Sequence, residues 1–143
     1  MSAIQQNPMA AAEGNSKVML WAGRVLWAIF VLFMIMDVTM KLLRLPIVET
    51  AGQSLGLPKG SGFPIGIMEL VILGLYVWPR TALLGVVLAT ALMGGTVATH
   101  LIAGSPWGNS VLFGVYLALI AWGGLWFRDP VLRALLPVRP AVS

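Results

Sequence analysis

Four long apolar stretches, separated by short polar segments, follow one another along the 143-residue chain. A helix rises about 1.5 Å per residue, so roughly 20 apolar residues cross a hydrocarbon core about 30 Å thick. The pattern predicts an all-α integral membrane protein, built as an antiparallel four-helix bundle over residues 17–137. The expected spans are about 17–43, 64–78, 82–103 and 110–127, of which the second is short for a crossing.

The segments between these spans are rich in residues that end helices. Pro46 marks the end of the first span, and residues 45–62 form a predicted loop rich in Gly, Pro and Ser. Residues 78–81 read Trp-Pro-Arg-Thr and predict a tight turn, which makes the two spans that it joins antiparallel neighbours. Residues 1–16 and 138–143 are predicted to be terminal tails, the first of them disordered.

Composition excludes a soluble globule and several kinds of cofactor site. The chain is 59% hydrophobic and 10% charged, whereas soluble domains carry about 25% charged residues. It has no cysteine, which excludes disulfide exchange, thiolate metal sites and iron–sulfur clusters held by its own residues. Its single histidine cannot supply the two axial imidazoles of a usual membrane b-type haem. We therefore predict one membrane domain, with no metal site and no cofactor.

The net charge of +4 indicates membrane topology and not nucleic-acid binding, because the basic residues stand at the ends of the apolar segments. Basic residues are enriched on the cytoplasmic side of membrane proteins, so both termini are predicted to be cytoplasmic, in a multi-pass protein of the bacterial inner membrane. The richer side holds Lys17, Arg24, Arg80, Arg128, Arg133 and Arg139, and the other side holds Lys41, Arg44 and Lys59.

Four ionisable side chains interrupt the apolar segments at one predicted depth, the outer third of the bilayer. They are Asp37 and Lys41 in the first span, Glu69 in the second and His100 in the third. Ionisable groups inside a bilayer are costly and usually face a bundle interior or a cavity. These four residues are therefore our candidates for a ligand-binding or proton-handling site, and no catalytic residue is assigned.

The cluster has two interpretations that the residues leave open. Lys41 can pair with Asp37 at i, i+4 spacing or equally with Glu69 across the bundle, and such a pair can pin the helix register without any ligand. Alternatively the group forms a small-molecule pocket or a proton-handling site. We predict that Lys41 and Glu69 approach within salt-bridge distance or share a bridging water.

The chain resembles the DoxX-like family of four-helix bacterial membrane proteins over roughly residues 17–137. The resemblance rests on the order and spacing of weak motifs: Lys41, Leu55-Gly56-Leu57-Pro58, Gly66-Ile67-Met68-Glu69-Leu70, Pro79 with Gly85, Gly94-Gly95, Thr99-His100, Trp122-Gly123-Gly124-Leu125 and Arg128-Asp129-Pro130. It implies a four-helix membrane fold. Some wider relatives look like subunits of quinone-linked sulfur oxidation and others accompany redox maturation, but a chain without cysteine does not suit a thiol role.

Two functions are carried forward from the sequence. The first is an accessory or interaction subunit of a membrane redox system, in contact with the lipid bilayer and with a membrane protein partner or a second copy. The alternative is a small membrane enzyme or carrier that binds a hydrophobic small molecule, quinone-like or isoprenoid-like, at a polar intramembrane pocket. The sequence leaves open whether the protein is an enzyme.

Overall fold

The computed structural model describes residues 8–136, with side chains from Ser16 onward, and this part of the chain is helical without a strand. The elements in chain order are α1 (Pro8–Leu42), α2 (Pro46–Ser54), α3 (Gly62–Val77), α4 (Ala82–Ile102), a π-helical turn η1 (Trp107–Val111), α5 (Leu112–Arg128) and α6 (Pro130–Leu135). The predicted tail at 138–143, residue 137 and residues 1–7 lie outside the described residues.

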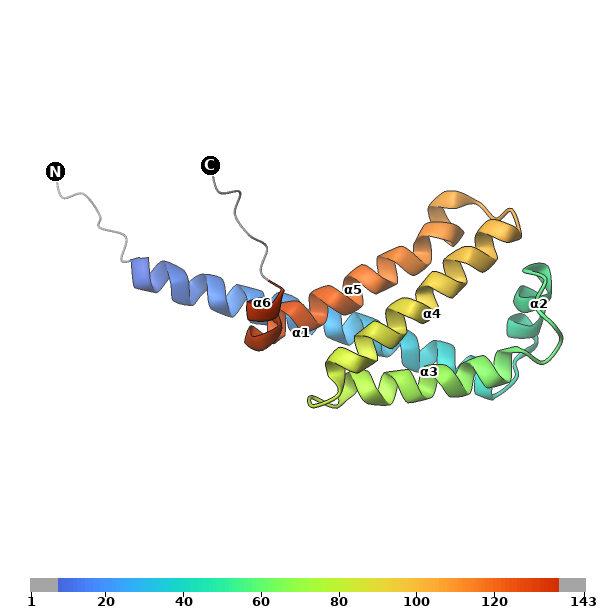
Figure 1. Ribbon diagram of the computed structural model, residues 1–143, viewed down its shortest axis with the longest axis horizontal. Coiled ribbons are helices and arrows are strands. Elements are labelled where there is room, and N and C mark those ends of the chain that lie inside the picture. Colours follow the sequence, from blue (N-terminus) through green and yellow to red (C-terminus); the bar gives the residue numbers. More distant parts are fainter. Residues whose placement is uncertain (1–7, 137–143) are drawn as a thin grey trace.

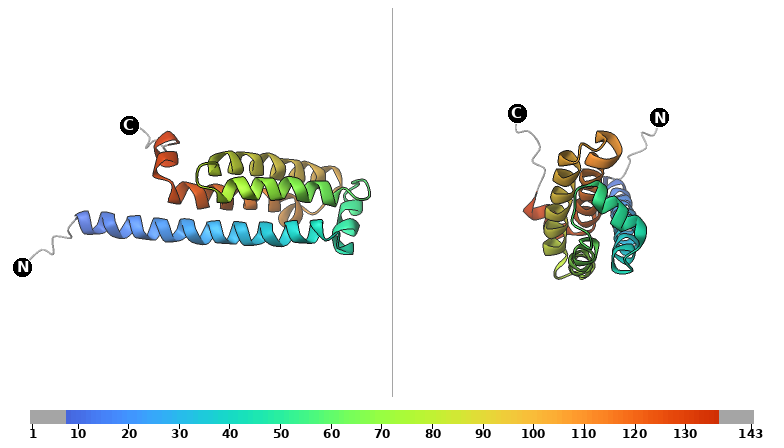
Figure 2. Two further views of the ribbon diagram at one scale, coloured as in Figure 1. Left: turned by 90° about the horizontal axis from the view of Figure 1, so that it is seen from below. Right: turned by 90° about the vertical axis from the view of Figure 1, so that its right-hand side faces the viewer.

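The four long helices pack as a ring in which each contacts two others. Helix α1 packs against α3 and α5, and α4 packs against the same two helices from the other side. The predicted tight turn between residues 78 and 81 joins α3 to α4, which lie side by side (Figures 1 and 2). Within this turn the Thr81 hydroxyl donates a hydrogen bond to the Leu75 carbonyl over 2.8 Å.

The helices have the length and surface of a membrane protein. Three of them are long and apolar enough to cross a bilayer, over Ser16–Leu42, Ala82–Ile102 and Trp107–Arg128, and α3 is a shorter apolar helix of 16 residues. Their outward faces expose large apolar side chains, among them Val25, Ile29, Leu32, Leu84 and Leu119. A soluble monomer rarely exposes so large an apolar surface, so these faces contact lipid.

Close helix approach in the core depends on glycines and on one buried tyrosine. Tyr76 is buried, its ring meets Phe30 edge to face at 4.9 Å between centroids, and its hydroxyl donates to the Ala121 carbonyl over 2.8 Å. A Cβ at Gly85 would lie 2.5 Å from the Tyr76 Cα, and one at Gly124 would lie 2.8 Å from the Trp27 amide nitrogen. Small residues at these positions let the helix backbones approach, as membrane interfaces favour.

The structure differs from the sequence expectation at two places. Helix α1 begins at Pro8, so residues 8–16, expected in a disordered tail, are helical; proline suits a first turn and Ala10–Ala12 are strong helix formers. Helix α2 occupies part of the expected loop at 45–62. The glycines in this segment favoured the prediction of a loop. Pro46 in the first turn and the acidic Glu49 are, however, both typical of a helix start.

Candidate functional site

A cavity of about 730 Å³ lies at the end of the ring where α1 and α4 end and α3 begins. Helices α1 to α5 all contribute to its lining, together with the loop after α2. Most of the lining is apolar, and the four ionisable residues singled out from the sequence, Asp37, Lys41, Glu69 and His100, all belong to it. The expected convergence of three helices at one depth therefore occurs around a single cavity.

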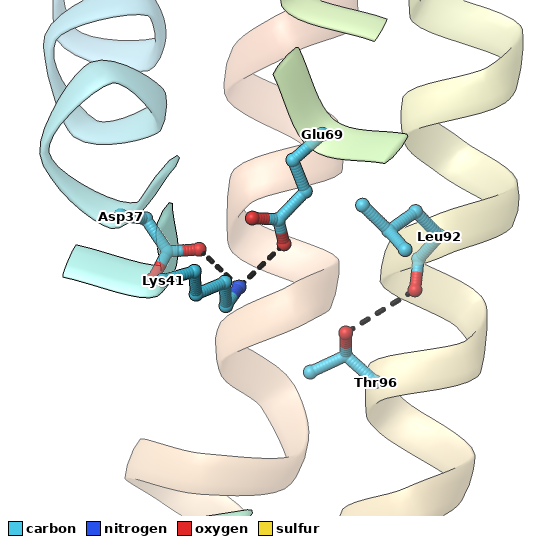
Figure 3. A network of polar contacts seen from close by, with 5 residues as sticks. All are labelled: Asp37, Lys41, Glu69, Leu92 and Thr96. Carbon is cyan, nitrogen blue, oxygen red and sulfur yellow. Dashed lines mark hydrogen bonds and ion pairs between the residues drawn. The ribbon is translucent and has the colours of Figure 1, made fainter. Parts of the chain in front are cut away.

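Lys41 links the two carboxylates of this cluster. Its Nζ lies 2.6 Å from Asp37 Oδ2 on the same helix and 2.5 Å from Glu69 Oε1 on α3 (Figure 3). The prediction that Lys41 and Glu69 reach salt-bridge distance is confirmed. The two pairings that the sequence offered as alternatives are both present, so we name these three residues the ion triad.

The backbone of α3 makes the cross-helix contact geometrically accessible. Gly66 lies one turn before Glu69, and a Cβ at Gly66 would stand 2.8 Å from the Lys41 Cβ. The missing side chain lets α3 approach α1 closely at this level. A helix repeats its face after three or four residues, so Glu69 then reaches the Lys41 ammonium.

Burial differs sharply among the three members of the ion triad. The Glu69 side chain is 4% exposed, against 18% for Lys41 and 23% for Asp37. Glu69 Oε2 is buried and has no hydrogen-bond partner among residues 16–136. An unsatisfied buried polar atom costs free energy, so this oxygen is a strong acceptor that the described protein leaves unused.

Three helices end around the cavity with the same capping geometry. Arg44, Gly56 and Gly104 have positive φ angles of 52°, 78° and 67°, and each follows the last turn of a helix. The next amide in each case bonds a carbonyl five residues back: Leu45 to Met40 at 3.2 Å, Leu57 to Gly52 at 2.9 Å, and Ser105 to His100 at 3.0 Å. This is the Schellman motif, and it holds the helix ends that surround the cavity.

His100 lines the cavity but is not bonded to the ion triad. Its Nδ1 lies 3.1 Å from Ser105 Oγ, within the cap that ends α4. The single histidine of the chain thus shares the cavity with Glu69 while its ring nitrogen is held by the local cap. The structure does not join His100 and Glu69 as a hydrogen-bonded pair.

One acidic lining residue was missed by the sequence analysis. Glu49 on α2 belongs to the cavity lining, and its Oε2 accepts a hydrogen bond from the Gly60 amide over 2.9 Å. This bond ties α2 to the loop that precedes α3. The residue escaped notice because it lies in the segment expected to be a loop.

The chemistry available at the site follows from its donor set. Carboxylates and an ammonium can hold a polar group and exchange protons, and the apolar walls can hold a hydrocarbon body. Within the described part of the chain no three His, Asp or Glu side chains come close enough to hold a metal ion. The arrangement suits recognition of an amphipathic small molecule.

Comparison with protein families agrees with the resemblance seen in the sequence. A family model described as the DoxX-like family matches residues 25–124, well over half of the chain, and this range contains the whole ion triad and His100. Comparison with curated proteins and with solved structures yields no match. The chain is thus a membrane protein that belongs to the DoxX-like family.

Proposed function

We propose that this protein binds a hydrophobic small molecule in the cavity at the end of the helix ring, with the ion triad at its polar end. The observation that carries the proposal is the placement of all four intramembrane candidates on the lining of one cavity of about 730 Å³. Ligand pockets typically measure about 300–1,000 Å³ and combine apolar walls with a few polar groups. This cavity has both properties.

A purely structural role explains less of the geometry. A pair that only pins two helices together is best sealed and fully hydrogen-bonded. Here the most buried carboxylate has one oxygen without a hydrogen-bond partner among residues 16–136, and it borders a cavity. The interpretation as an accessory subunit of a membrane redox system stays a prediction, because exposed apolar faces serve lipid and a protein partner alike.

The proposed setting is the bacterial inner membrane, crossed four times as an antiparallel bundle with both termini in the cytoplasm. The excess of basic residues and the tryptophans Trp21, Trp78 and Trp126 at one edge support this orientation. In that orientation the cavity lies toward the extracytoplasmic face, since α1 and α4 end there. A solute would reach the ion triad from that side.

Reporter fusions test the proposed topology. A reporter inserted after Ser54 is expected to lie outside the cytoplasm and one fused at the C-terminus inside it, because three spans, an odd number, separate them in the four-span arrangement. The readout is a pair of enzymes active on opposite sides of the membrane. Reporters that both register the same side would contradict four spans.

The variant Glu69→Gln separates binding from folding. Gln keeps the shape and an acceptor oxygen but loses the charge, and Lys41 keeps its contact with Asp37. We expect the variant to stay folded while it retains at most about a tenth of the small molecule that copurifies with the native chain, as a lost charge-assisted bond of 1.4 kcal/mol or more predicts. Mass spectrometry of the extracted protein measures the ligand.

Tyr76→Phe provides the matched control for this experiment. It removes the buried hydrogen bond to the Ala121 carbonyl, and Tyr76 does not belong to the lining of this cavity. We expect it to lower stability by about 1 kcal/mol and to retain the ligand. A Glu69→Gln variant that loses stability and keeps its ligand would support the structural role and overturn the proposed function.

A further inference from the structure

The charges on the cavity lining are unbalanced toward negative. Among the described residues, three carboxyl groups line it, from Asp37, Glu49 and Glu69, against one ammonium from Lys41. That ammonium is already engaged by two of the three carboxylates. The two other basic residues placed on this side, Arg44 and Lys59, are not part of the lining, and Arg44 instead stacks over the Phe63 ring at 4.5 Å from its centroid. Excess charge in apolar surroundings is costly unless it is compensated.

The unpaired oxygen of Glu69 sets a second requirement. Glu69 is buried, and its Oε2 receives no hydrogen bond from the residues that the structure describes. An ionised carboxylate oxygen can only accept, so the partner that ionised Glu69 lacks is a donor. An acidic or purely accepting head group would leave this oxygen unpaired, whereas a protonated amine would satisfy it.

Aromatic side chains complete the environment of the cavity. Phe33 and Phe113 both belong to the lining and pack edge to face, with ring centroids 5.3 Å apart. Aromatic faces attract cations, and they do so more strongly where water is excluded. The same rings give an apolar body a surface to pack on.

We infer that the molecule bound in this cavity is a lipophilic cation, with an apolar body and a protonated amine that bonds Glu69. The inference rests on the proposed function, because it names the chemical class of the ligand for the same cavity. It separates this site from one for quinones, whose carbonyl oxygens only accept hydrogen bonds, and from one for fatty acids, whose charge has the wrong sign.

Three probes with one apolar body and different head groups test this inference. They are 4-phenylbutylamine, 4-phenylbutanol and 4-phenylbutanoate, offered at pH 7 to the full chain in zwitterionic lipid nanodiscs, with protein-free nanodiscs subtracting partition into lipid. Equilibrium dialysis measures each affinity. We expect the amine to bind at least tenfold more tightly than the alcohol and the butanoate to bind most weakly.

Two variants test whether the expected preference for the amine comes from the carboxylates of the cavity lining. Glu69→Gln is expected to weaken amine binding at least tenfold while changing alcohol binding less than threefold. Glu49→Gln removes a charge from the lining outside the ion triad, and a smaller loss of amine affinity, about threefold, is expected. The second variant keeps the test valid even where Glu69→Gln folds poorly.

The outcomes separate this inference from the proposed function. If the alcohol or the butanoate binds as tightly as the amine to the native chain, the cation inference is overturned while the binding cavity stands. The cation inference also falls if both Gln variants keep the native preference for the amine. If none of the three probes binds above the protein-free control, both the inference and the proposed function are overturned.

Discussion

Replacing Lys41 with methionine is expected to lower the free energy of unfolding by about 3–5 kcal/mol, the usual effect of removing one partner from a buried ion pair. Methionine fills a similar volume but leaves Asp37 and Glu69 without their shared cation. The loss of the cation destabilises Glu69 more than Asp37, because the Glu69 side chain is only 4% exposed. Unfolding by sodium dodecyl sulfate in mixed micelles, followed by tryptophan fluorescence, measures the loss.

A double-mutant cycle shows whether the effect comes from the ion triad itself. Adding Glu69→Gln to Lys41→Met removes the most buried of the uncompensated charges, and the remaining Asp37 is 23% exposed and can be hydrated. We therefore expect the double variant to be more stable than Lys41→Met alone. Strict additivity of the two changes would contradict a direct interaction.

Arg44→Met is the matched control for the loss of a basic residue at this end of α1. Arg44 is exposed and contacts the Phe63 ring, without an ion pair among the described residues. An exposed cation–π contact contributes about 0.5–1 kcal/mol, so this control should cost far less than Lys41→Met. Equal losses would assign the effect to general charge removal.

The helices and the ion triad could be predicted because strong physical constraints act on them. Apolar segments of sufficient length belong in a bilayer, and the expected span ends agree with the observed helix ends to within about three residues, except that α1 begins at Pro8, well before the expected start at residue 17. Charged groups in such segments gather where they can compensate one another. This argument placed Asp37, Lys41 and Glu69 together, and the observed distances agree with it.

The cavity and its finer contacts could not be predicted in the same way. The volume of the cavity depends on how α2 and the loop after it lie across the end of the ring. Helix α2 itself was not predicted, because the glycines of residues 45–62 indicated a loop. The ring of His100 is held by Ser105, a contact created by the cap that ends α4. That cap depends on the left-handed backbone conformation of Gly104, which the pattern of apolar residues does not predict.

Filling the cavity from α4 is the second change with a large expected effect. Gly95 belongs to the lining, and a Cβ at this position would meet nothing within 4 Å. The Cβ of Gly95→Leu therefore enters open space, and the branched side chain extends from the cavity wall into the volume proposed for the ligand. We expect ligand affinity to fall more than tenfold, since overlap with a bound molecule cannot be relieved by the surrounding helices. Stability should change by less than about 1 kcal/mol.

Gly94→Leu is the control for this substitution. Gly94 precedes Gly95 on the same helix and is equally free of neighbours within 4 Å, but it does not belong to the cavity lining. Both variants add the same side chain to the same turn of α4. Only the direction of the added side chain relative to the cavity differs between them.

Native mass spectrometry of the intact protein, released from detergent, tests the central claim most directly. We predict a small-molecule adduct on the native chain and on Gly94→Leu, and its loss from Gly95→Leu. Retention of the adduct by Gly95→Leu, or its equal loss from both variants, would contradict binding in the cavity beside Lys41 and Glu69.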